Sequence, residues 1–101
     1  MNQQTIYKTP DEIITVDLDF SRFSPYDITT FLGYEITDLA TGNSSSELVV
    51  EESQISNDKH HIYLKISGGV SGKIYILQVK VRFSNTDELE AVLYVIMEEF
   101  L

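Results

Sequence analysis

The sequence has no cysteine, few basic residues and no long apolar run. Without cysteine there is no disulfide framework, no cysteine-ligated zinc and no thiol catalysis. Seven lysines and arginines stand against sixteen aspartates and glutamates, and the net charge is −9. Since this charge would repel a phosphate backbone, we expect no nucleic-acid partner.

No segment approaches the roughly 18 to 20 apolar residues that a membrane-spanning helix requires. Residues 1–8 are polar and lack the apolar core of a signal peptide. We therefore expect no membrane association and assembly in the cytoplasm. A length of 101 residues with 43% hydrophobic side chains supports one core. We predict a single domain over residues 1–101, with residues 1–9 as a flexible or partner-docked arm.

Residues 62–83 contain two runs in which apolar and polar side chains alternate. The apolar positions are Ile62, Leu64 and Ile66 in the first run, and Tyr75, Leu77, Val79, Val81 and Phe83 in the second. A period of two is that of a strand with one buried face. The intervening residues include Gly68, Gly69 and Gly72, which tolerate positive φ and let the chain reverse or pass from one sheet to another.

Further strands are predicted on both sides of this stretch. Residues 13–20 alternate, and residues 47–51 follow a serine-rich loop. Residues 27–39 and 89–100 have apolar side chains at helical spacing, yet both are rich in β-branched and aromatic residues, which favour strands. We predict strands for both, and interpret the last as central in its sheet or covered by another subunit. The predicted fold is an all-β sandwich.

A pair of carboxylates is the sequence feature closest to catalytic machinery. Asp17 and Asp19 lie two residues apart on one face of a predicted strand, and paired carboxylates perform acid–base work in glycosidases. Charged residues that alternate outward on a half-buried strand are also what solvent exposure produces. We favour the solvent-exposed interpretation and assign no catalytic residue.

No metal or cofactor site is assigned either. His60 and His61 are adjacent, so in a strand they point to opposite sides and cannot chelate one ion together without a bulge. The glycines of the corner are followed by a strand and by no Lys-Ser or Lys-Thr pair, which argues against a phosphate loop. The acidic residues that offer calcium ligands lack the spacing of a calcium loop: Asp11, Glu12, Glu51, Glu52 and Asp58.

Candidate partner contacts lie at the two chain ends and at the glycine corner. An apolar chain end tends to dock on its own domain or on a partner, and tyrosine is enriched in interfaces. We therefore predict contacts at Ile6, Tyr7, Gly68, Gly69, Gly72, Phe100 and Leu101.

Three stretches taken in order carry a resemblance to one family. They are a Pro-Asp-Glu opening in residues 8–12, an aspartate-aromatic-serine segment in residues 19–23, and a Ser-Gly-Gly corner at the end of residues 62–69. In these features the chain resembles the small immunoglobulin-like structural proteins of tailed bacteriophages known as fiber-tail adaptors. The resemblance extends from Lys8 to about Met97.

The resemblance implies a fold, a location and a class of partner. The fold is an immunoglobulin-like β-sandwich of about seven antiparallel strands, with no active site and no cofactor. The location is the virion, after assembly in the host cytoplasm, and the partners are other virion proteins of the tail, the portal region or the fiber, with homo-oligomers on the particle. The alternatives are a head decoration protein that binds the capsid and a module that binds carbohydrate or the host surface.

Overall fold

The computed structural model of the chain describes residues 2–23 and 25–98, and this part contains strands, one 3-10 turn and no α-helix. No helix in it is long and apolar enough to cross a membrane. The 3-10 turn is η1 (Ser21–Phe23), and the strands are β1 (Asn2–Lys8), β2 (Ile14–Asp19), β3 (Ile28–Asp38), β4 (Leu48–Ile55), β5 (His61–Gly68), β6 (Ile74–Phe83) and β7 (Glu88–Met97).

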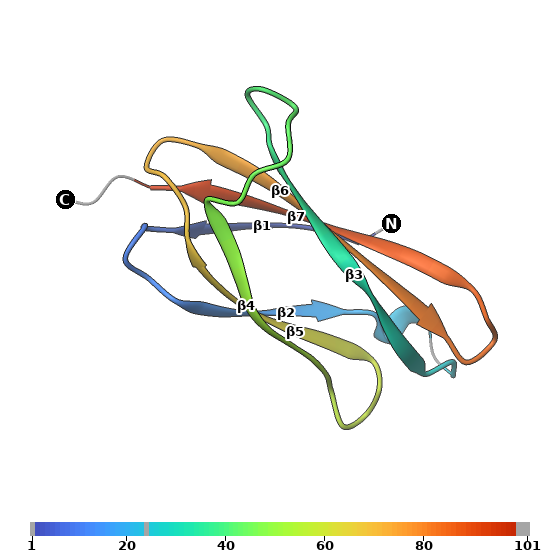
Figure 1. The fold of residues 1–101 in the computed structure, drawn as a ribbon. Coiled ribbons are helices and arrows are strands. Elements are labelled where there is room, and N and C mark those ends of the chain that lie inside the picture. The colour runs from blue at the N-terminus through green and yellow to red at the C-terminus, as the bar shows by residue number, and fades with distance from the viewer. Residues whose placement is uncertain (1, 24, 99–101) are drawn as a thin grey trace.

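The strands form two sheets that face each other in a sandwich-like arrangement (Figure 1). The four-stranded sheet has the order β1-β7-β6-β3, and the three-stranded sheet has the order β2-β5-β4. Every neighbouring pair is antiparallel except β1 and β7, which run parallel. The predicted all-β sandwich is confirmed at this level.

The core lies between the sheets and follows the alternation of the sequence. In β5 and β6 every second side chain is buried, because successive side chains of a strand point to opposite faces. Their burial supplies the main favourable free energy of folding. The most deeply buried apolar members of the core include Phe20, Ile62, Leu64, Ile66, Tyr75, Leu77, Val79, Val81, Leu93 and Val95.

Both segments with an ambiguous period are strands in the structure. Residues 27–39 contain β3, and residues 89–100 contain most of β7 within their described part. β7 lies between β1 and β6, which is the first of the two alternatives given for the last strand. Pairing with a strand on each side satisfies the backbone hydrogen bonds of β7. Its valines and isoleucines favour a strand, and this outweighs the helical spacing of its apolar positions.

The structure corrects two expectations and decides one alternative that the sequence left open. Residues 1–9 were expected to be a flexible or partner-docked arm, but Asn2–Lys8 form β1 along the last strand of the same chain. The strand predicted at residues 47–51 is longer and reaches Ile55. The alternating runs at residues 62–83 do not pair with each other, because the glycine corner carries the chain from the three-stranded sheet to the four-stranded one.

Close contacts hold this corner in place. Gly68 has φ of +76°, and a Cβ atom built on it would lie 2.6 Å from the carbonyl oxygen of Glu47. The buried side chain of Lys8 reaches the corner from β1, and its Nζ donates hydrogen bonds to the carbonyl oxygens of Gly68 at 2.7 Å and Thr9 at 2.8 Å. Burial lowers the pKa of Lys8. The corner therefore links β1, β5 and the start of β4.

We predict that Gly68→Ala lowers the free energy of unfolding by about 3 kcal/mol or more, because positive φ and a backbone clash act together. Gly42→Ala is the matched control, since Gly42 has φ of +73° and a Cβ there would meet no atom within 4 Å. The control should lose only about 1 kcal/mol. Urea unfolding of the two variants measures both values, and equal losses would contradict the clash at the corner.

Candidate functional site

The outer face of the four-stranded sheet carries a row of apolar side chains across all its strands. Tyr7 of β1 pairs with Ile96 of β7, and Ile96 pairs with Ile74 of β6. Leu39 continues the row directly after β3, because its backbone nitrogen donates to the carbonyl oxygen of Ile74 at 2.9 Å. Tyr7 and Leu39 are exposed to 60% and 47%.

A second uncharged row lies beside the first. Tyr94 of β7 and Ile76 of β6 are paired, and they are flanked by Thr5 of β1 and Thr37 of β3. The apolar members of the two rows are half-buried or exposed, and together we call them the apolar patch: Tyr7, Leu39, Ile74, Ile76, Tyr94 and Ile96. A contiguous uncharged patch of this kind on a sheet face is typical of a contact surface.

The same face becomes polar and then charged toward its other end. Gln78 of β6 pairs with Glu35 of β3 on one side and with the mostly buried Val92 on the other. The following rows pair Lys80 with Glu90 and Arg82 with Glu88. The outer face therefore has an apolar end and a charged end.

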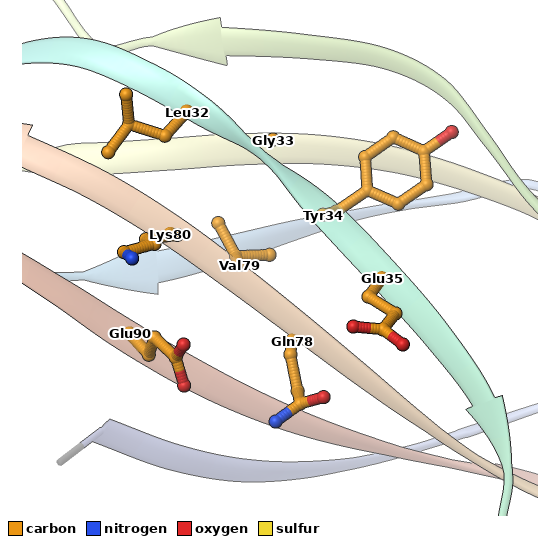
Figure 2. Close-up of a pocket in the computed structure, with 8 residues that line it drawn as sticks. All are labelled: Leu32, Gly33, Tyr34, Glu35, Gln78, Val79, Lys80 and Glu90. Atoms are coloured by element: carbon orange, nitrogen blue, oxygen red, sulfur yellow. The ribbon is translucent and has the colours of Figure 1, made fainter. Parts of the chain in front are cut away.

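A shallow hollow of about 310 Å³ lies in the polar part of this face (Figure 2). Gly33 of β3 forms part of its lining and leaves space there because it has no side chain. It lies next to an irregularity in the pairing of β3 with β6. Figure 2 shows Glu35, Gln78 and Glu90 extending from three neighbouring strands on one side of the sheet, whereas Tyr34 lies on the other side of β3. The charged residues that line the hollow are thus two carboxylates, Glu35 and Glu90, and one lysine, Lys80.

Ion pairs engage the cations at both ends of the face. Arg82 Nη2 lies 2.7 Å from Glu88 Oε2, and Lys80 Nζ lies 3.4 Å from Glu88 Oε1. The hydrogen bond from Arg82 lowers the pKa of Glu88. At the apolar end, Lys73 Nζ lies 2.9 Å from Glu47 Oε1 and 3.2 Å from the carboxylate of Asp38.

The ion pairs of Lys73 at the apolar end of the face connect to the core through Tyr75. Its hydroxyl donates to Glu47 Oε1 at 2.8 Å and accepts a hydrogen bond from the backbone nitrogen of Val70 at 3.0 Å. Burial raises the pKa of Tyr75, and the hydrogen bond with Glu47 raises the pKa of Lys73. This network fixes the loop after β3 and the crossover before β6, which border the apolar patch.

The predicted contact residues have different places in the structure. Tyr7 belongs to the apolar patch, whereas Ile6 is half-buried and packs against the core. The corner glycines lie against the strands: Gly69 faces the side chain of Met97, and the nitrogen of Gly72 donates to the carbonyl oxygen of Met97. Phe100 and Leu101 lie outside the described residues.

Sequence reasoning missed most of the apolar patch. Leu39, Ile74 and Ile76 were not among the predicted contacts, although Ile74 and Ile76 occupy the outward positions of β6. The sequence did contain a signal for Ile74 and Ile76: these two outward positions of the strand are apolar, whereas the later outward positions, Lys80 and Arg82, are charged. Tyr94 and Ile96 were included only in the interpretation of the last strand as central in its sheet or covered by another subunit.

The acidic pair lies on the outer face of the three-stranded sheet. Asp17 Oδ1 contacts His61 Nδ1 at 2.7 Å, and the two aspartate side chains at positions 17 and 19 are 53% and 60% exposed. His60 contacts a different carboxylate, Asp27, at 3.4 Å. Within residues 2–23 and 25–98, no group of three or more histidines or acids is placed to hold a metal ion.

No protein-family model matches the chain, and no curated protein matches it.

We predict that the pair of Asp17 and His61 makes stability depend on pH. The hydrogen bond from His61 Nδ1 to the carboxylate of Asp17 raises the pKa of His61 above its usual value, so protonation favours the fold. This contribution is complete below the unfolded pKa of about 6.5 and disappears as pH rises through the folded pKa. Asp17→Asn should lower the free energy of unfolding by about 0.5–1 kcal/mol at pH 6, and by less at pH 9.

Urea unfolding at the two pH values measures this difference. Glu52→Gln is the control, because it removes the same charge from an exposed position in β4 of the same sheet. An effect of Asp17→Asn that is equal at both pH values would contradict a charged pair with His61.

Proposed function

We propose that this chain is a non-catalytic structural protein that acts by protein–protein contact through the apolar patch. The observation that carries the proposal is the set of paired, uncharged rows across the outer face of the four-stranded sheet. Tyr7 and Leu39 leave a large part of their apolar surface in water. Covering such surface yields about 25 cal/mol per Å².

The composition of the patch suits a binding role. Tyrosine offers a large apolar area with a polar tip and loses little conformational freedom on binding, and Tyr7 and Tyr94 supply it from neighbouring strands. The isoleucines between them are held by a hydrogen-bonded sheet, so little ordering is needed when a partner docks. An open, uncharged sheet face of this type favours a protein partner over a small molecule.

We further propose that the sandwich is immunoglobulin-like. In immunoglobulin domains strands B, E and D are neighbours in one sheet, and strands C, F and G are neighbours in the other. The orders β2-β5-β4 and β3-β6-β7 correspond to these two sets. The first strand departs from the constant-type arrangement, because β1 joins the four-stranded sheet beside β7.

The setting that we propose is the particle of a tailed phage, with the chain as a tail or fiber-tail adaptor. The support is the resemblance carried by residues 8–12, 19–23 and 62–69. A head decoration protein would use the same physical mode of binding but would be present in far more copies. Immunogold labelling of purified particles, with copy number from quantitative mass spectrometry, distinguishes the two. Absence from particles would contradict both.

We predict that the double variant Tyr7→Ser, Leu39→Ser reduces incorporation into particles about tenfold or more, because it removes the two most exposed apolar side chains of the patch. Ile13→Ser, Val49→Ser is the matched control: these residues are 61% and 41% exposed and lie outside the patch. Quantitative mass spectrometry of particles measures incorporation, and urea unfolding checks that both variants remain folded.

Normal incorporation of the patch variant would refute the proposed binding face. Equal losses in both double variants would point to general surface hydrophobicity instead of the patch.

A further inference from the structure

Among the described residues, the lysine and arginine side chains beside the outer face all have partners within the chain. Lys73 is paired with Asp38 and Glu47, and Lys80 and Arg82 share Glu88. The remaining one, Lys8, is buried, and its Nζ donates to two backbone carbonyls. A partner carboxylate that approached this face would have to compete with existing bonds.

Two carboxylates on the same face are in the opposite situation. Glu35 and Glu90 are exposed, and neither makes an ion pair within the part of the chain that the structure describes. Both flank the hollow that Gly33 lines without a side chain (Figure 2). Lys80 also lines the hollow, but its Nζ is paired with Glu88 at 3.4 Å. The hollow therefore offers two carboxylates and open space together, within a chain whose net charge is −9.

The hollow and the apolar patch lie along one strand direction. Ile76 of the patch and Lys80 beside the hollow are both on the outer face of β6, four residues apart. A strand rises roughly 3.3 Å per residue, so their separation is about 13 Å. An extended peptide segment aligned with β6 would reach both the apolar patch and the hollow with two of its side chains that are about four residues apart.

We propose that this face binds a basic segment of another protein, with apolar side chains on the apolar patch and an arginine or lysine in the hollow between Glu35 and Glu90. This inference rests on the proposed function and names the chemistry of the partner. A guanidinium suits the hollow because it is planar, donates in several directions and binds carboxylates strongly. The net charge of the chain attracts a basic partner before contact is made.

A second copy of the chain is a poorer occupant of this face. Two copies would each bring a charge of −9, and the cations that border the face are already paired or buried. A face-to-face dimer would then bring acidic surfaces together with no unpaired cation to offset them. The occupant is therefore a different, basic protein.

The test uses a library of random dodecapeptides displayed on their own mRNA and selected against the immobilised full chain. The expected enriched peptides carry an arginine or lysine about four residues from a cluster of aromatic or branched apolar residues. One enriched peptide is then synthesised, and its affinity is measured by calorimetry at two salt concentrations.

Paired variants assign the two halves of the site. The double variant Glu35→Gln, Glu90→Gln should weaken binding of this peptide about tenfold and reduce its salt dependence, since the attraction between the two carboxylates and the basic side chain of the peptide is lost. The control Glu51→Gln, Glu52→Gln removes the same charge from β4 of the opposite sheet and should leave affinity within about twofold. Tyr7→Ser, Leu39→Ser should also weaken binding.

The outcomes separate this inference from the proposed function. Enriched peptides that are apolar without a basic residue, or that bind the Gln variants normally, overturn the basic partner and leave the patch as the binding face. Binding that is indifferent to Tyr7→Ser, Leu39→Ser overturns the proposed function. No enrichment overturns a peptide-like basic partner, and a concentration-dependent dimer in sedimentation makes a second copy the occupant.

Discussion

The contact between Gly68 and the carbonyl of Glu47 is the constraint on which the rest of the structure depends. At this point the chain leaves the three-stranded sheet, and only a residue without a Cβ fits against the start of β4. Lys8 binds the carbonyl of Gly68 from the end of β1, so the first strand is fixed at the same point. Because a buried ammonium is costly unless its donors are satisfied, the position of Lys8 also fixes β1 beside β7.

The crossover at this corner decides which side chains of β6 face the core. Once Tyr75 points inward and its hydroxyl binds Glu47, the period of two places Ile74 and Ile76 on the outer face, with Lys80 and Arg82 further along it. The orientation of β6 therefore produces both the apolar end and the charged end of the outer face. The same orientation of β6 places Lys73 beside the apolar patch. Its ammonium group is paired there with Asp38 and Glu47, so no unpaired lysine charge lies next to the patch.

The cations and the carboxylates near the four-stranded sheet differ in how far they are paired within the chain. Its few cations near the four-stranded sheet are buried or paired internally, and each such pair contributes modestly to stability because it is partly exposed. Their greater effect is on recognition, because among the charged residues that the structure describes on the outer face of this sheet, internal pairing leaves carboxylates available to a partner. In the binding mode that we propose, exposed apolar surface supplies affinity, while the remaining negative charge selects which protein approaches.

The sequence by itself determined the strands from β2 onward and the buried side of most of them, because alternation, β-branched residues and glycines act locally. It identified the corner glycines and one patch residue, Tyr7. Only the tertiary structure decided that β1 pairs with β7, that β5 and β6 belong to different sheets, and that Leu39 lies in line with Ile74. These facts depend on pairing between distant segments, which no local pattern encodes, and the candidate site is made of such pairings.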